Sequence, residues 1–113
     1  MNVTAESYGH TVLLNVKGEL TDDTITAFKQ AVDHNLPGKG AMDVVLNMEA
    51  VTFVDSVFLE YLLDLQDRLG ERLGQVKLIK PDDNVRKILE ITRLSGNFDV
   101  FKDVGEAVKA IQT

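Results

Sequence analysis

The chain has 113 residues, of which 44% are apolar, and its 18 acidic and 12 basic side chains give a net charge of −6 at pH 7. This length is typical of one domain, so we expect a single domain over residues 1–113, and the apolar share excludes a wholly disordered chain. The absence of cysteine excludes disulfides and thiolate metal sites, and the scattered lysines and arginines argue against nucleic-acid binding.

The first 17 residues predict a β-hairpin. Residues 2–8 alternate weakly and fit an edge strand, residues 10–17 alternate better, and a tight turn is expected at 8–10. This polar start does not resemble a signal peptide, and no apolar run approaches the roughly 20 residues of a membrane helix. We therefore expect a cytoplasmic protein without membrane insertion.

A helix is predicted after the hairpin. Thr21 is a plausible N-cap, and Asp22 and Asp23 suit the first helical turn. Apolar residues then recur at helical spacing from 25 to 32, and the helix should end near Leu36. The apolar run at 43–48 predicts a buried central strand, which continues in extended form to residue 54.

The clearest helix pattern covers residues 57–73. Leu59, Leu62, Leu63, Leu69 and Leu73 lie on one face, and Gly74 fits the glycine that follows a helix. A strand at 76–79, a helix at 84–92, a strand at 98–101 and a helix at 104–111 complete the chain. This alternation predicts an α/β sandwich with a mixed, mostly parallel β-sheet of about five strands and about four α-helices.

Ser56 is the best candidate for a functional atom. It lies between a predicted strand and the start of a helix, where a phosphate would meet unpaired backbone N–H groups and the positive end of the helix dipole. Sites in such sheets lie at the carboxyl ends of strands, so Thr21–Asp23 and Asp55–Ser56 should converge on one surface. Two simpler roles stay open: Ser56 as an N-cap, and Asp55 as a carboxylate that accepts backbone N–H bonds.

The chain resembles STAS domains of the anti-sigma-factor antagonist family over nearly its whole length. The resemblance is carried by Gly18-Glu19-Leu20, residues 44–48, Phe53-Val54-Asp55-Ser56 and residues 84–89. In the family pattern the serine directly after the aspartate is phosphorylated, and Ser56 holds that position. The resemblance implies a non-enzymatic protein with no cofactor or metal, which binds a kinase-type anti-sigma factor while Ser56 is unphosphorylated and so frees a sigma factor. It also implies that the kinase phosphorylates Ser56 and that a PP2C-type phosphatase reverses the step.

Partner binding is expected around Ser56. Phe58, Tyr61 and Leu65 flank the leucine face, and they could form either an exposed apolar patch for a partner or the periphery of the core. Phe58 is the main interface candidate because it lies close to Ser56 in the sequence. A homodimer is left open. The expected partner-binding residues are Thr21, Asp22, Asp23, Asp55, Ser56, Val57, Phe58, Glu60 and Tyr61.

Two other hypotheses stay open. The family has a hydroxyl residue and small residues where this chain has Val57, Phe58 and Glu60, which favours a STAS scaffold in a stress-signalling or transport-associated complex whose serine is never modified. The second is a magnesium-dependent phosphoacceptor of receiver type, with Asp55 as nucleophile and Asp22-Asp23 as metal ligands. The spacing from Asp55 to Lys80 counts against it, since a receiver needs another strand and helix between them.

Overall fold

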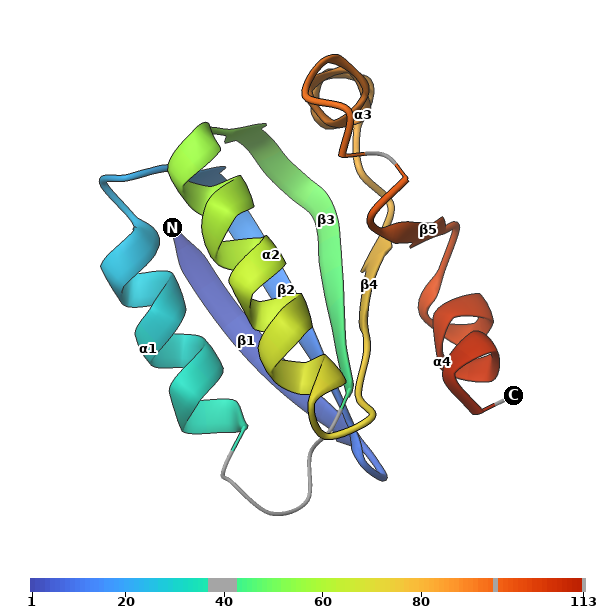
Figure 1. Cartoon of the computed structure of the whole chain (residues 1–113). Helices are drawn as coiled ribbons and strands as arrows, with labels where there is room; N and C mark the ends of the chain where they lie inside the picture. The colour runs from blue at the N-terminus through green and yellow to red at the C-terminus, as the bar shows by residue number, and fades with distance from the viewer. Residues whose placement is uncertain (37–42, 95, 113) are drawn as a thin grey trace.

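A five-stranded mixed sheet lies at the centre of the structure, a computed structural model that describes residues 1–36, 43–94 and 96–112 (Figure 1). The spatial order of the strands is β1-β2-β3-β4-β5; β1 pairs with β2 antiparallel, and the other pairs are parallel. The strands are β1 Asn2–Tyr8, β2 Thr11–Leu20, β3 Asp43–Val54, β4 Val76–Ile79 and β5 Asp99–Phe101, and the helices are α1 Ile25–Asn35, α2 Ser56–Gly70, α3 Asp83–Ile91 and α4 Val104–Gln112. The predicted fold class and the predicted hairpin are confirmed.

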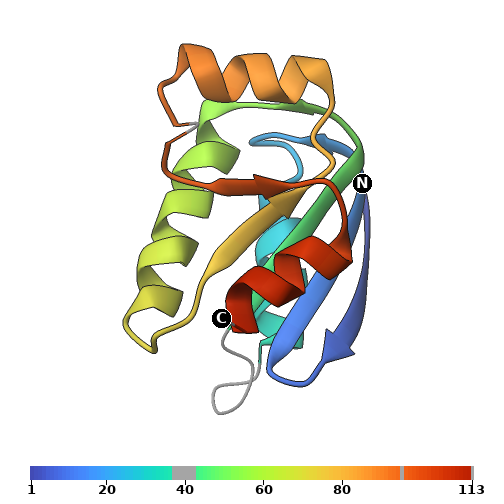
Figure 2. The same ribbon diagram turned by 90° about the vertical axis from the view of Figure 1, so that its right-hand side faces the viewer.

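The two faces of the sheet carry cores of unequal size. Alternate side chains of β2 to β4, such as Leu14 and Leu46, pack with Phe28 of α1, Leu62 of α2 and Leu89 of α3 into the larger core. The residues between them on the strands face the opposite side, where a smaller cluster of Leu13, Val45, Ile79 and Ala107 lies under α4. Figures 1 and 2 show α1 and α2 on one side of the sheet and α4 on the other. None of the helices in the described ranges is long and apolar enough to cross a bilayer.

Helix α1 begins three residues later than the sequence indicates. Its N-cap is Thr24, not Thr21, and no side chain caps it. Thr21–Thr24 instead form a turn, in which the Thr21 N–H donates to Thr24 Oγ1 at 3.0 Å and the Thr24 hydroxyl donates to the Glu19 carbonyl at 2.9 Å. The predictions of a Thr21 cap and of Asp22 and Asp23 in the first helical turn are therefore wrong, because this turn keeps all three residues outside the helix.

Helix α2 ends three residues before Leu73. The N–H of Gly74 donates to the Leu69 carbonyl at 2.7 Å and that of Leu73 to Gly70 at 3.0 Å, which is the Schellman arrangement of a helix C-terminus. Leu73 takes the left-handed position with φ of 64° and is 92% exposed. The predictions that Leu73 lies on the apolar helix face and that Gly74 takes the left-handed position are wrong.

Candidate functional site

The carboxylate of Asp55 ties together the two segments that the sequence places at strand ends. Its Oδ2 accepts the N–H of Asp22 at 2.8 Å, and its Oδ1 accepts the N–H of Phe58 at 3.0 Å. Parallel pairing sets this geometry, because Leu20 and Val54 end neighbouring strands in register. The loop after β2 and the start of α2 therefore meet on one surface, as the sequence predicted.

Asp55 is the N-cap of α2, with extended backbone at φ −115° and ψ 179°. Ser56 is the first helical residue and is exposed. Its interpretation as an N-cap is therefore wrong, because the neighbouring carboxylate takes that role and leaves the serine hydroxyl unneeded for the helix. No hydrogen bond to another described residue occupies the N–H groups of Ser56 and Val57, as is usual in a first helical turn.

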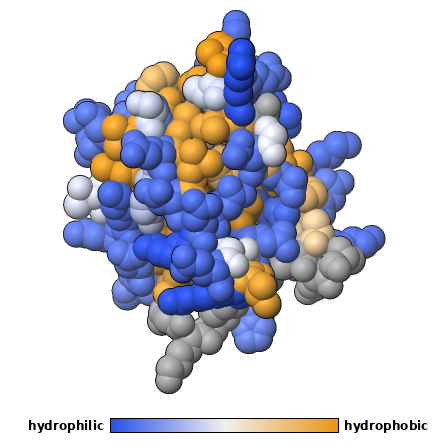
Figure 3. All heavy atoms as spheres, in the orientation of Figure 1, coloured by the Kyte–Doolittle hydropathy of each residue, from blue (hydrophilic) through white to orange (hydrophobic). Residues whose placement is uncertain are grey.

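Exposed apolar side chains lie on either side of Ser56 in the sequence. Phe53 is 46% exposed near the end of β3, and Val57 is 40% exposed in the first turn of α2. Asp22 and Asp23 are also exposed, in the loop whose Asp22 N–H bonds to Asp55, the residue before the serine. We call Asp22, Asp23, Phe53, Ser56 and Val57 the Ser56 surface. Figure 3 shows apolar surface gathered in the upper part of the molecule, between α2 and α3, with hydrophilic atoms around it.

Phe53 was not among the sequence candidates. Strand alternation does not single it out, since Thr52 and Phe53 are both exposed while Val51 and Val54 are both buried. The signal available in the sequence was its place three residues before Ser56, at the end of a buried strand.

Phe58 lies inside the larger core. It is 0% exposed, and its ring meets that of Phe28 edge-on, with centroids 5.4 Å apart and an interplanar angle of 70°. Leu65, two turns further along α2, is 1% exposed. The interpretation of Phe58 as an exposed interface residue is wrong, because the helix that Asp55 caps directs positions 58, 62, 65 and 69 inward. The Phe58 side chain therefore packs in the core beneath the first turn of α2 and is not part of the Ser56 surface.

Tyr61 is half-buried between α1 and α2. Its ring stands edge-on to Phe28 at 5.9 Å, and Lys29 Nζ lies 5.3 Å from its centroid. Burial raises the pKa of the Tyr61 hydroxyl above its ordinary value; the Arg68 charge opposes this shift, and that of Asp33 adds to it. A small groove of about 200 Å³ runs past this ring, lined by Lys29, Val57, Glu60, Tyr61 and Asp64.

The geometry contradicts the receiver hypothesis. Receiver sheets have the strand order 2-1-3-4-5, whereas this sheet has the order β1-β2-β3-β4-β5 with an antiparallel first strand. Both Asp55 oxygens already accept backbone N–H groups. Within residues 1–36, 43–94 and 96–112, no group of three or more His, Asp or Glu side chains is placed to hold a metal ion.

The chain is similar in sequence and in fold to proteins that are named anti-sigma factor antagonists. A Thermotoga neapolitana protein, named a TM1081 homolog and candidate anti-sigma factor antagonist, is 25% identical over 101 residues, which are 89% of each chain. An anti-sigma factor antagonist from Mycobacterium paratuberculosis superposes with a TM-score of 0.85 at 22% identity, over 99% of this chain and 94% of that one.

SpoIIAA, a Bacillus cell fate determinant, has been solved in an unphosphorylated and in a phosphorylated form. The unphosphorylated anti-sigma factor antagonist SpoIIAA superposes with a TM-score of 0.81 at 21% identity, over 98% of this chain and 96% of that one. The phosphorylated form gives 0.73 at 19% identity, over 97% and 99%. These likenesses show the shared fold, and the STAS domain family model matches residues 2–107. The chain therefore belongs to the STAS domain family.

Proposed function

We propose that this protein is an anti-sigma-factor antagonist that is switched at Ser56. With the serine unmodified, it binds a kinase-type anti-sigma factor in the bacterial cytoplasm and so frees a sigma factor. Phosphorylation of Ser56 by that kinase breaks the complex, and a PP2C-type phosphatase restores it. One observation carries the proposal: Ser56 is exposed at the first position of α2, and Asp55 has already taken the capping role that would otherwise occupy its hydroxyl.

The Ser56 surface suits reversible binding of a protein. Phe53 and Val57 offer exposed apolar area, while the Asp55 contacts hold the loop of Asp22 and Asp23 against the helix start. A partner that covers this area would remove Ser56 and its neighbours from water. Surfaces that combine apolar area with a fixed backbone are typical of protein contacts.

A phosphate on Ser56 would act on the partner rather than on the helix. It adds a charge of about −1.5 to −2, which the N-terminus of a helix accommodates well. The same charge would lie beside Asp55 and close in sequence to Glu60, in a contact that must be desolvated for the partner to bind. Burying such a charge without a counterion is costly, so the complex should dissociate while the domain stays folded.

A second candidate is an unmodified STAS scaffold. Val57 and Glu60 stand where the family carries a hydroxyl or a small residue, and both are exposed on the first turns of α2. In that case the Ser56 surface would bind a partner constitutively, and the kinase and the phosphatase would have no role.

Binding and phosphorylation measurements separate the two candidates. Purified kinase-type anti-sigma factors encoded in the source genome are titrated with the wild type, Ser56→Ala and Ser56→Asp by calorimetry. We expect Ser56→Asp to weaken binding at least tenfold, about 1.4 kcal/mol, relative to Ser56→Ala. Ser7→Asp, at an exposed serine on β1, is the matched control for added charge and should bind as the wild type does.

The phosphorylation arm uses the same proteins with ATP, followed by mass spectrometry. Phosphate should appear on Ser56 and be absent from the Ser56→Ala protein. Equal affinities of Ser56→Asp and Ser56→Ala would refute the switch. Binding with no phosphate transfer from any of these kinases would favour the scaffold.

A further inference from the structure

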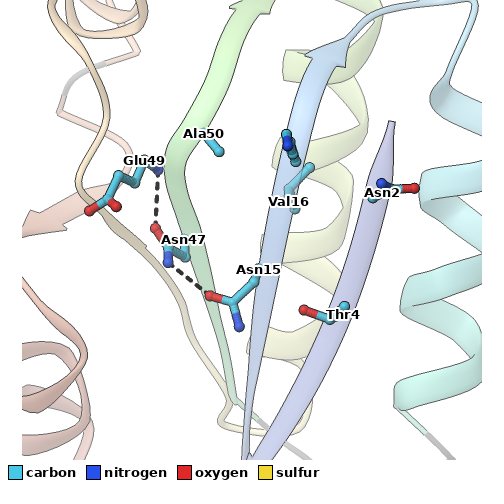
Figure 4. Close-up of a pocket in the computed structure, with 8 residues that line it drawn as sticks. Asn2, Thr4, Asn15, Val16, Asn47, Glu49 and Ala50 are labelled. Atoms are coloured by element: carbon cyan, nitrogen blue, oxygen red, sulfur yellow. Dashed lines mark hydrogen bonds between the residues drawn. The ribbon is translucent and has the colours of Figure 1, made fainter.

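A polar pocket opens on the face of the sheet opposite α1 and α2 (Figure 4). It has a volume of about 320 Å³, and residues of β1, β2 and β3 line it. No residue of α4, the helix that covers part of this face, is among them. The lining residues are Asn2, Thr4, Asn15, Val16, Lys17, Asn47, Glu49 and Ala50.

The side chains of β2 and β3 on this face change from apolar to polar beyond the cluster that lies under α4. Leu13 and Val45 are paired across β2 and β3 and belong to the apolar cluster under α4. Two residues further along each strand, on the same face, the pair is Asn15 and Asn47. Asparagine is depleted in strands, so two of them side by side are not explained by strand formation.

A β-bulge fixes the orientation of both amides. The register of β2 and β3 shifts between Asn15 and Lys17, and there the N–H of Glu49 donates to Asn47 Oδ1 at 3.0 Å. Asn47 Oδ1 is thereby the acceptor, so its Nδ2 donates to Asn15 Oδ1 at 2.8 Å. Asn15 is left with its Nδ2 group, which makes no hydrogen bond to another described residue. Figure 4 shows this chain from Glu49 through Asn47 to Asn15.

The charges of the pocket favour an anion. The Glu49 carboxylate pairs with Lys80 Nζ at 3.1 Å, which offsets its charge. Lys17 lines the pocket and makes no salt bridge to a described carboxylate. The Asn15 amide and the Lys17 ammonium are both donors, and the Thr4 hydroxyl can serve as a third.

We propose that this pocket binds a small organic carboxylate. Its oxygens would accept from the Asn15 amide and the Lys17 ammonium, while the methyl group of Ala50 contacts its carbon atoms. The volume lies at the lower end of the range of about 300–1,000 Å³ for small-molecule pockets, which limits the ligand to a compact acid. So small a ligand in an open pocket should bind with a dissociation constant of about a millimolar.

The test is an NMR titration of the full chain with acetate, pyruvate and succinate, each against sodium chloride of equal ionic strength. We expect saturable shifts of the Asn15 and Asn47 side-chain amides with at least one acid. Asn15→Asp replaces the donor by a second carboxylate at nearly constant size and should weaken that binding at least tenfold. Asn84→Asp, at an exposed position of α3, is the matched control and should leave it unchanged.

Lys17→Gln provides a second variant, at an exposed position where folding is not at risk, and should weaken binding severalfold. Lys87→Gln, on α3, is its control. Shifts that equal those of sodium chloride for all three acids would overturn the proposal. Binding that survives both Asn15→Asp and Lys17→Gln would overturn it equally.

Discussion

Asp55 should contribute more to the free energy of unfolding than an ordinary N-cap residue does. The substitution Asp55→Ala removes the bond to Phe58 N–H, a capping interaction worth about 1 kcal/mol, and the bond to Asp22 N–H, worth about 1 kcal/mol more. We therefore expect a loss of about 2 kcal/mol in the free energy of unfolding. For a chain of this size that lowers Tm by about 8 °C.

The chain supplies the control. Asp82 caps α3 through one bond, from Val85 N–H at 2.8 Å, so Asp82→Ala should cost about 1 kcal/mol. Urea denaturation followed by circular dichroism measures both, with m-values compared to verify a common unfolded state. Asp55→Asn keeps a capping oxygen and loses the carboxylate that bridges to Asp22, so it should fall between wild type and Asp55→Ala. Equal losses in Asp55→Ala and Asp82→Ala would refute the bridging role.

Three further substitutions test other parts of the structure. Phe58→Ala should cost about 3–5 kcal/mol in urea unfolding because the side chain is fully buried, whereas Val57→Ala should cost under about 1 kcal/mol; similar losses would contradict the burial of Phe58. Leu73→Gly should stabilise the protein by about 0.5–1 kcal/mol, since it relieves a left-handed backbone, and a lower Tm would count against this. Because the pKa of Tyr61 is raised in the folded state, stability should fall as pH rises above about 10, where only the unfolded chain loses this proton. Tyr61→Phe should reduce that fall in urea midpoints measured from about pH 9 to 11, and an unchanged slope would contradict it.

Much of the fold follows from local patterns. The strand at 76–79 was predicted with its observed bounds, and the hairpin, the central strand and the meeting of the two strand ends were all found. These features depend on side-chain period, turn residues and the parallel order of strands, which neighbouring residues reveal. Ser56 was placed correctly at the helix start, although its hydroxyl does not cap the helix.

Some of the errors lie where contacts distant in the sequence decide the structure, and one lies at a helix end, where a local turn decides it. Whether Ser56 or Asp55 caps α2 depends on the loop at Asp22, which is 33 residues away from Asp55. Phe58 and Leu73 were misplaced because the direction and the end of the helix follow from that cap and from the Schellman turn. The polar pocket was missed because it needs the pairing of Asn15 with Asn47 and a bulge between their strands, which one sequence does not reveal.

Because the strands differ in length, we expect different parts of the sheet to differ in their stability against local opening. β2 and β3 span 10 and 12 residues, whereas β5 has three residues and pairs only with β4. Local opening follows the elements with the fewest backbone bonds, so β5 and α4 should exchange their amide hydrogens first. The Ser56 surface rests on the ends of β2 and β3. It can therefore keep its shape while the C-terminal quarter of the chain opens and closes.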